Sequence, residues 1–235
     1  MLDTGDRLPF CQGCIADLEQ KLPRPVCAKC GRPVVPAALE ETGSATLCHL
    51  CRHEVYDFDL ARSFGAYTPS MARAILLLKY GEMTPLGGWF ARLLAQVVEE
   101  ERVALEADAV VPVPLHAVRL RERGYNQADL IARPLARMLG LPFRSYLLVR
   151  TRPRPDKLRL TRRERWETVR GAYAPREGAH VDKLRVLLVD DVFTTGATLD
   201  ACSKALRKAG AAQVLGLTVA RAASPVVPPG AADLE

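Results

Sequence analysis

A thirteen-residue segment, 186–198, constrains the fold of this chain more than any other feature of the sequence. It reads Val-Leu-Leu-Val-Asp-Asp-Val-Phe-Thr-Thr-Gly-Ala-Thr. Four consecutive apolar residues predict a buried strand, and the Thr/Gly loop after them predicts the start of a helix. Ligands of open α/β sheets bind beyond the C-terminal ends of the strands, and a helix N-terminus there offers unpaired N–H groups to a phosphate. The segment therefore predicts a site for a phosphorylated ligand in an α/β protein.

Two kinds of group in this segment have different predicted roles. The carboxylates of Asp190 and Asp191, the predicted catalytic pair, are placed to take ribose hydroxyls or a cation. The loop and the first helical turn are placed to surround a phosphate. Their residues are Val192, Thr194, Thr195, Gly196, Ala197 and Thr198. The segment resembles the 5-phosphoribosyl-1-pyrophosphate (PRPP) loop of type I phosphoribosyltransferases.

A second loop has the same character. Residues 111–127 begin with Val-Pro-Val-Pro-Leu-His and end with Arg-Glu-Arg-Gly-Tyr-Asn-Gln, so a short strand stops and a helix opens after it. Several guanidiniums suit the second half of a bisphosphorylated ligand, because Arg matches phosphate oxygens bidentately. The alternative is a solvated loop in which Asn126 only caps the helix. The candidate ligand-binding residues are Pro114, Leu115, His116, Arg119 and Arg123.

Hydrophobic periodicity from residue 61 onward alternates between helices and strands. Residues up to about 58 are instead rich in Cys, Pro and turn formers and show no sustained helical or strand period. The alternation predicts a mostly parallel sheet with helices on both faces. Predicted helices span 71–79, 86–100 and 126–139, with a fourth between the Thr/Gly loop and Gly210, and predicted strands span 109–113, 184–189 and 214–219.

Cysteine spacing explains the N-terminal part of the chain. There is no basic-then-apolar leader and no stretch near the roughly 18 apolar residues that span a bilayer, so we expect a cytoplasmic protein without membrane insertion. Cytosolic thiols stay reduced, yet six of the seven cysteines form three Cys-x-x-Cys pairs before residue 52. The second and third pairs match a tetrahedral Zn²⁺ site, with redox pairs or unrelated buried thiols as the alternatives. The predicted ligands are Cys27, Cys30, Cys48 and Cys51.

The remaining cysteines lie outside that predicted zinc site. The first pair, Cys11 and Cys14, is two ligands too many for one tetrahedral site and two too few for a second. His49 and His53 are candidates to complete a mixed site, although His49 lies inside a knuckle, where a solvent-facing or structural role fits better. Cys202 lies on the apolar stripe of the last predicted helix and is expected to be a buried small hydrophobe.

Basic residues concentrate in one stretch, 150–170. It holds nine basic and three acidic residues, a net +6 that equals the formal charge of the whole chain. A polyanionic partner such as single-stranded DNA is one interpretation, and a solvated basic loop is the other. Only Trp166 and Tyr173 offer aromatic rings in or beside the stretch, which makes a base-stacking surface weak. Walker A and dinucleotide glycine patterns are absent, which argues against nucleotide hydrolysis and NAD chemistry.

Three blocks in this order resemble the ComF family of phosphoribosyltransferase-like proteins: the Cys-x-x-Cys pairs, the Val-Pro-Val-Pro-Leu-His block and the Asp-Asp loop. The resemblance runs from about Cys11 to Arg221. It implies an N-terminal zinc ribbon, a type I phosphoribosyltransferase fold and a link to DNA uptake in naturally competent bacteria. It also implies PRPP with Mg²⁺ as ligand, its ribose at Asp190 and Asp191, and its pyrophosphate near residues 114–116.

The same resemblance implies an organisation. Residues 1–58 are expected to form the zinc-ribbon module, 59–223 the phosphoribosyltransferase domain and 224–235 a flexible tail. Many family members open with a further Cys-x-x-Cys pair that this sequence lacks. A truncated or misassigned start would therefore account for Cys11 and Cys14 without partners.

Two functions follow from these expectations. The first is a transferase that displaces pyrophosphate from the anomeric carbon through an oxocarbenium-like state, with Arg119, Arg123 and backbone N–H groups stabilising the leaving group. His116 is a general-base candidate by residue type, and a structural loop residue is the alternative. The second is a non-catalytic protein that senses PRPP and binds single-stranded DNA, with the competence machinery as its partner.

Overall fold

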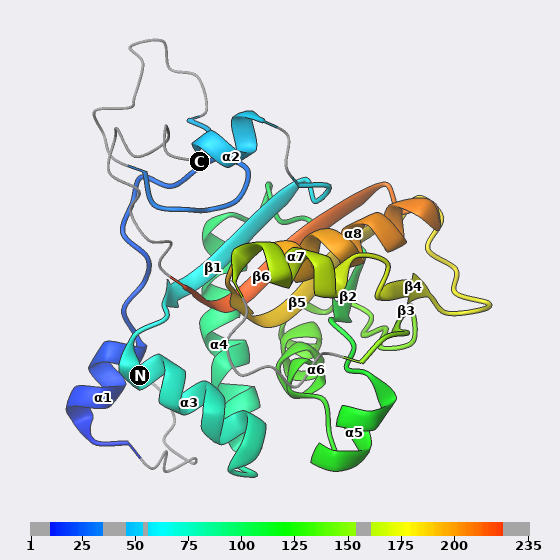
Figure 1. Ribbon diagram of the computed structural model, residues 1–235. Helices are drawn as coiled ribbons and strands as arrows, with labels where there is room; N and C mark the ends of the chain where they lie inside the picture. The colour runs from blue at the N-terminus through cyan, green and yellow to red at the C-terminus, as the bar shows by residue number, and fades with distance from the viewer. Residues whose placement is uncertain (1–9, 35–45, 54–55, 154–160, 223–235) are drawn as a thin grey trace.

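The computed structural model describes residues 10–34, 46–53, 56–153 and 161–222 (Figure 1). Its core is a four-stranded sheet in the order β1-β6-β5-β2, and all neighbouring strands are parallel. The predicted fold class, a mostly parallel sheet with flanking helices and a small cysteine module, is confirmed. The strands are β1 (Leu60–Ala66), β2 (Ala109–Pro112), β5 (Arg185–Phe193) and β6 (Gln213–Arg221).

The two central strands carry the segment that opened the sequence analysis. All of β6 after its first residue is buried, as expected for a parallel strand covered on both faces. β5 continues past its predicted end at Val189, because β6 still pairs with it there. Asp190 lies opposite Thr218, and the strand ends only at Phe193. The two aspartates therefore belong to the strand and not to the loop after it.

Helices cover both faces of the sheet (Figure 1). Leu187 and Val189 of β5 pack with α3, α4 and α6, whereas Val186 and Leu188 pack with α8, the alternation expected of a strand. All four predicted helices are present. Among the described residues, no helix combines the length and apolar character needed to cross a membrane. The helices on the two faces are α3 (Pro69–Tyr80), α4 (Pro85–Glu100), α6 (Gln127–Leu139), α7 (Arg162–Val169) and α8 (Ala197–Lys208).

Local chemistry sets the helix ends that position the site. The hydroxyl of Thr68 accepts the amide of Met71 at 3.3 Å, and Pro69 occupies the first helical position of α3. The side chain of Asn126 caps α6. Gly140 ends the same helix in the left-handed conformation, at φ 66°. These capping signals are local, which is why the predicted bounds of α6 agree with the structure.

Several short elements were not predicted. The region before residue 58 has no sustained helical period, yet the short helix α1 forms there, and Leu18 at its end is buried in the core beside α3 and α4. α5 buries no residue, so its sequence has no apolar stripe. β3 and β4 form an antiparallel pair of three residues each, which is too short to show a period in hydrophobicity. The elements missed are β1, α7 and also α1 (Gln12–Leu18), α2 (His49–Arg52), α5 (Ala117–Arg123), β3 (Leu148–Arg150) and β4 (Tyr173–Pro175).

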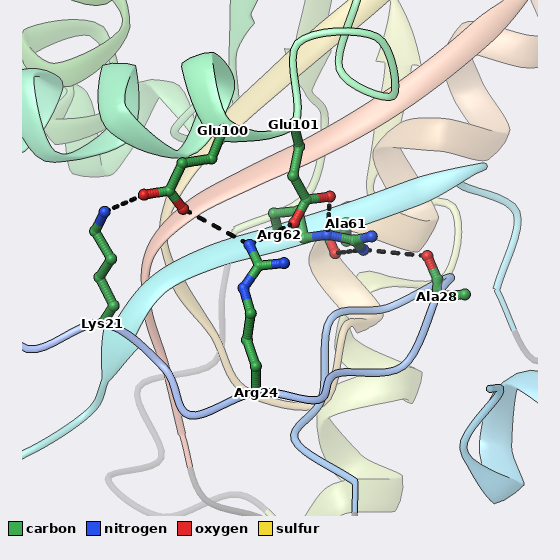
Figure 2. A network of polar contacts seen from close by, with 7 residues as sticks. All are labelled: Lys21, Arg24, Ala28, Ala61, Arg62, Glu100 and Glu101. Atoms are coloured by element: carbon green, nitrogen blue, oxygen red, sulfur yellow. Dashed lines mark hydrogen bonds and ion pairs between the residues drawn. The ribbon is translucent and has the colours of Figure 1, made fainter. Parts of the chain in front are cut away.

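A charged network ties the N-terminal segment to the main sheet (Figure 2). Arg62 of β1 pairs with Glu101 at 2.5 Å, and the two side chains are only 11% and 12% exposed. The same guanidinium donates to the carbonyl oxygen of Ala28 at 3.1 Å, and Arg24 contacts Glu101 at 3.2 Å. The described N-terminal residues with the four clustered cysteines, within 26–53 and here called the cysteine module, are thus held against the sheet. The boundary of the module at residue 58 stays a prediction, and the predicted tail, 224–235, lies outside the described residues.

Candidate functional site

Two buried aspartates lie side by side near the end of β5. Asp190 is 9% exposed and Asp191 is 4% exposed. The amide of Asp191 donates to Oδ1 of Asp190 at 2.9 Å. Burial first, and then the charge of Asp191, raise the pKa of Asp190 to about 7, against the opposing effect of Lys79. A fully ionised pair therefore needs positive charge or hydrogen-bond donors nearby.

Lys79 and Gln127 supply those donors. Nζ of Lys79 lies 2.7 Å from Oδ2 of Asp191, and Nε2 of Gln127 donates to the same oxygen at 2.9 Å. Lys79 comes from the last turn of α3 and Gln127 opens α6, so three elements meet at one carboxylate. Lys79 was not predicted as a site residue. Its one signal is a cation at the end of the apolar run Leu-Leu-Leu-Lys-Tyr.

The arginine-rich segment 113–126, which joins β2 to α6, includes α5 and is here called the arginine loop, reaches the aspartates through Gln127. Nη1 of Arg123 donates to Oε1 of Gln127, whose side-chain nitrogen holds Asp191. The guanidinium carbon of Arg123 also lies 4.8 Å from the centre of the Tyr80 ring. The structure therefore joins Arg123 and Asp191, which come from two separate sequence blocks, in one chain of hydrogen bonds.

The rest of the arginine loop makes local contacts. Nδ1 of His116 accepts the amide of Val118 at 3.3 Å and caps α5, which agrees with the structural alternative for this histidine. Arg119 forms an ion pair with Glu122 at 3.1 Å. Asn126 does cap α6, as the alternative interpretation of this loop predicts. The half-buried residues between β2 and α5 are Pro114, Leu115 and His116.

Gly196 shapes the loop after β5. Its φ is +83°, and a Cβ there would lie 2.6 Å from Cε1 of Tyr56, so both backbone conformation and space require glycine. As the N-cap of α8 it brings no side chain, and Oγ1 of Thr195 accepts the Ala197 amide only at 3.4 Å. The N–H groups at the start of α8 therefore suit an anion. The other residues predicted for this phosphate site are half-buried, and they are Val192 in β5, Thr194 in the loop and Thr198 in the first turn of α8.

The four predicted cysteines form one buried cluster. Their sulfur atoms all lie within 4.8 Å of one another, and Sγ of Cys30 lies 3.7 Å from Sγ of Cys48. Four thiolates about 2.3 Å from a tetrahedral Zn²⁺ stand about 3.8 Å apart, so the cluster has the size of a zinc site. Gly31, at φ +69°, closes the first knuckle where a Cβ would lie 2.6 Å from the carbonyl oxygen of Ala61.

The ionisation of these thiols also fits a metal. Hydrogen bonds from Cys30, then from Cys48 and Cys51, lower the pKa of Cys27. Hydrogen bonding to Cys27 in turn raises the pKa of Cys51. The pKa of Cys48 is lowered as well, so the cluster favours thiolate at some of its sulfurs, and a cation that replaces the shared protons would be bound by thiolates. Four converging sulfur ligands suit Zn²⁺ better than Mg²⁺, which prefers oxygen ligands.

Cys11 and Cys14 lie apart from this cluster. They stand at α1, far from α2 (Figure 1), and are exposed and half-buried, respectively. Within the described part of the chain, the four-cysteine cluster is the only group of three or more metal-binding side chains. His49 and His53 do not join it, and their rings contact each other with centres 4.5 Å apart. Cys202 is fully buried on α8, as predicted.

The basic stretch 150–170 is described in part, since residues 154–160 lie outside the described residues. Its helix α7 carries Arg163, whose side chain is 88% exposed while pairing with a glutamate of the same helix at 2.9 Å. Trp166 packs inward, with its ring centre 6.0 Å from that of Tyr56. The tryptophan of this stretch therefore contributes to internal packing and not to an exposed stacking surface.

Comparisons with known proteins place the chain in a family. No family model matches the sequence. The chain is 31% identical over 208 residues to DNA utilization protein YhgH of Salmonella typhimurium, covering 87% of each protein. It is 30% identical over 217 residues to Competence protein F of Haemophilus influenzae, covering 91% of this chain and 90% of the relative. The chain belongs to the ComF family. Another relative of this ComF protein is Competence protein ComFC of Bacillus subtilis, 27% identical over 90% of this chain and 83% of that protein.

Solved structures similar to this ComF-family chain include phosphoribosyltransferases. The glutamine PRPP amidotransferase from B. subtilis matches 56% of this chain with 24% identity and a TM-score of 0.37, and the match spans 25% of that chain. Adenine phosphoribosyltransferase from Thermoanaerobacter pseudethanolicus matches 57% of this chain and 79% of its own, with 17% identity and a TM-score of 0.35. Both scores are below 0.5, so the fold rests on the observed sheet and the family relationship.

Proposed function

We propose that this ComF protein binds PRPP at the C-terminal edge of the sheet and transfers its phosphoribosyl group to an acceptor, releasing pyrophosphate. The observation that carries the proposal is the hydrogen-bonded chain from Arg123 through Gln127 to Asp191, next to a loop that leads into a helix N-terminus. Carboxylates flanked by a guanidinium and by free backbone N–H groups suit a ribose between two phosphate groups.

The 5′-phosphate belongs at the loop 194–198 in this proposal. The left-handed Gly196 turns the chain so that the first N–H groups of α8 point out of the helix. The helix dipole adds a favourable field for a dianion. The threonine hydroxyls of the loop supply further donors, as in other sites where a helix N-terminus holds phosphate.

The ribose belongs at Asp190 and Asp191, whose carboxylates accept hydrogen bonds from its hydroxyls. Before ligand binds, Lys79 balances their charge. A Mg²⁺ bound with PRPP would be shared between carboxylates and substrate oxygens and would offset negative charge on the pyrophosphate. Lys79 then has the phosphate oxygens as an alternative partner for its ammonium group.

The reaction breaks the bond between the anomeric carbon and the pyrophosphate oxygen, and the electron pair leaves with pyrophosphate. The acceptor forms the new bond to the same carbon, through a state with oxocarbenium character. In this proposal Arg119 and Arg123 of α5 stabilise the leaving pyrophosphate. His116 is engaged as a helix cap, so no step is assigned to it.

The proposal also includes a structural zinc ion, a cytoplasmic location and a role in DNA uptake. Zn²⁺ is expected at the four-cysteine cluster in a closed, structural site. Because that site needs reduced thiols, we expect the protein to work in the cytoplasm. The names of its relatives, a competence protein and a DNA utilization protein, support a role in DNA uptake.

Calorimetry with PRPP and Mg²⁺ tests the binding step. Asp191→Asn is expected to weaken binding about 100-fold, because hydrogen bonds to a charged carboxylate are the strong ones. Asp108→Asn is the matched control, since this carboxylate pairs with Arg185 at 2.9 Å near the start of β2, away from the site. No binding heat with the wild-type protein would overturn the proposal. Pyrophosphate release with a panel of amines and bases then identifies the acceptor.

A second function is favoured by the exposed side chains of Arg163 on α7 and Arg170 just after it, both in the described part of the +6 stretch. On this alternative the protein binds single-stranded DNA and uses PRPP as a signal. Its affinity would fall steeply with salt, because each neutralised phosphate contributes a slope of about −0.7. Arg163→Ala with Arg170→Ala is expected to lower that slope. A flat salt dependence would exclude this function.

A further inference from the structure

We propose that Tyr56 and Arg221 couple the cysteine module to the phosphate loop, so that the module positions the backbone that binds the 5′-phosphate. This inference rests on the proposed PRPP function. The module then does more than stabilise the N-terminal segment locally, because it also fixes the orientation of a peptide in the phosphate loop.

Tyr56 lies five residues after Cys51 in the sequence, and its side chain contacts the loop after β5. Its side chain is buried, at 3% exposure. Its hydroxyl donates to the carbonyl oxygen of Thr195 at 3.0 Å. Its ring stacks on Phe58 with centres 4.7 Å apart and meets Phe193 edge-on at 6.2 Å. A rigid aromatic group therefore holds one peptide carbonyl of the loop.

Holding that carbonyl also aims the next amide. The only cis peptide in the described chain is Arg24–Pro25, so the Thr195–Gly196 peptide is trans. In a trans peptide the C=O and the following N–H point in opposite directions. Because Tyr56 holds the Thr195 carbonyl on its own side, the Gly196 N–H points away from the module. A phosphate at the start of α8 is therefore expected on the side of the loop away from the module, where it can accept this N–H.

The module holds Tyr56 in turn through Lys29, which lies inside the first knuckle. Nζ of Lys29 donates to the carbonyl oxygen of Tyr56 at 2.7 Å. The backbone carbonyl of Lys29 accepts the amide of Ala61, at the start of β1, also at 2.7 Å. The knuckle between Cys27 and Cys30 is therefore bonded both to the sheet and to the residue that anchors the loop.

Arg221 makes a second link between the same two regions. It ends β6 and is only 4% exposed. Its guanidinium donates to the carbonyl oxygen of Cys30 and stacks over Phe193 with its carbon 3.8 Å from the ring centre. Phe193 is the last residue before the loop. A Zn²⁺ with four thiolates carries about two net negative charges, so this buried cation also balances the charge of the loaded module.

If Tyr56 positions the phosphate loop, removing its hydroxyl should weaken binding of the ribose 5-phosphate half of PRPP and not of the pyrophosphate half. Tyr56→Phe keeps the ring and removes only the hydroxyl. We expect about a tenfold weaker affinity for ribose 5-phosphate, the effect of one lost hydrogen bond to a buried carbonyl. The affinity for pyrophosphate with Mg²⁺, which belongs to the arginine loop after β2, should stay within about twofold of wild type. A residue that only fills space would change neither.

Calorimetry on zinc-loaded protein measures both affinities, and hydrogen exchange of the peptide containing 194–198 measures the loop directly. Tyr146→Phe is the control, because its hydroxyl accepts from Arg144 at 2.6 Å at an exposed position. Arg221→Lys keeps the positive charge but loses the planar contact, and is expected to weaken ribose 5-phosphate binding as well. Loop exchange should be about tenfold faster in Tyr56→Phe, with exchange in β1 unchanged.

The outcomes separate this inference from the proposed function. If wild type binds ribose 5-phosphate and Tyr56→Phe binds it equally well with unchanged loop exchange, the inference is wrong and the function stands. An equal loss of both ligands would also overturn it. If wild type binds no PRPP at all, the proposed function fails, and faster loop exchange in Tyr56→Phe alone still decides whether the coupling exists.

Discussion

The described residues include a buried cluster of thiols and a buried pair of carboxylates, and the charge of these two clusters is balanced in opposite ways. The four thiols converge within 4.8 Å, so protein ligands alone complete a tetrahedral metal site. The aspartates of β5 rely on cations from other elements, because Lys79 forms an ion pair with Asp191 and the charge of Arg150 also favours ionised Asp190. Two carboxylates are too few for a protein-only cage around a hard cation.

The difference separates a structural site from a binding site. When a metal ion binds the four thiols, its binding free energy adds directly to the free energy of folding. Leaving the aspartate cluster incomplete costs stability, which shows in the raised pKa of Asp190, and a ligand that completes the charge recovers it. Substitutions in the two clusters should therefore change stability in opposite directions.

The largest effect is expected at the thiol cluster. Cys48→Ala should abolish zinc binding, which in small zinc modules has an apparent free energy on the order of 10 kcal/mol. We expect unfolding of the module and a melting temperature lower by more than about 10 °C. Cys202→Ala removes a thiol that is also buried but lies outside the cluster and should lower stability by only about 1 kcal/mol. Metal analysis and thermal melts of the two variants check this, and equal melting temperatures would contradict a structural zinc site.

The next effect has the opposite sign and depends on pH. The pKa of Asp190 is raised from 3.8 to about 7, so the folded protein keeps a proton that the unfolded chain releases. Below pH about 4 both states are protonated and Asp190 causes no loss. As the pH rises from about 4 to above 7, the free energy of unfolding of the ligand-free protein falls by about 4 kcal/mol in total.

Asp190→Asn should remove that loss. Urea unfolding without ligand should show the variant more stable than wild type at about pH 8, with less than half of that gain at about pH 5. PRPP binding should be lost at the same time, because the ribose loses a carboxylate. Parallel stability curves for the two proteins would show that this aspartate is not strained in the ligand-free state.

A smaller effect is expected at the counter-ion. Lys79→Met leaves the Asp191 carboxylate with Gln127 as its remaining described donor, and should destabilise the ligand-free protein by about 1–2 kcal/mol at pH 8. Mg²⁺ alone should then stabilise the variant more than wild type, because the competing ammonium is gone. Lys204→Met is the control, since this lysine pairs with Asp200 on the same helix at 2.9 Å. Thermal shifts with and without Mg²⁺ measure both expectations, and equal Mg²⁺ shifts would argue against competition at Asp191.

Sequence patterns predicted the parts of this structure whose signals are local. The strand before Asp190, the helix ended by Gly140 and the cysteine knuckles all follow from spacing within a few residues. Each predicted phosphate loop was found at the end of a strand for the same reason. β1 escaped prediction because its Arg and Gly interrupt the apolar pattern, although β6 pairs with it along most of its length.

The missed site residues depend on packing between distant segments. Lys79 reaches Asp191 from a helix more than a hundred residues earlier in the chain, and nothing near Lys79 marks that contact. Tyr56 contacts Thr195 only because the cysteine module lies against the loop. The ligands of the four-cysteine cluster can be predicted from their spacing in the sequence. The partners of the aspartate pair cannot, because the tertiary fold brings them together from distant segments.

The smallest effect concerns the first Cys-x-x-Cys pair. Cys11 and Cys14 lie at α1, outside the four-cysteine cluster, which is the only group of three or more metal-binding side chains in the described residues. Cys11→Ser with Cys14→Ser should therefore leave zinc content at one ion per chain, and stability within about 0.5 kcal/mol of wild type, as for surface substitutions. Metal analysis before and after dialysis against a weak chelator measures the first, and urea unfolding measures the second. A drop in zinc content below that of wild type would show that this pair binds metal after all, and the comparison would then be between two thiol sites and one carboxylate site.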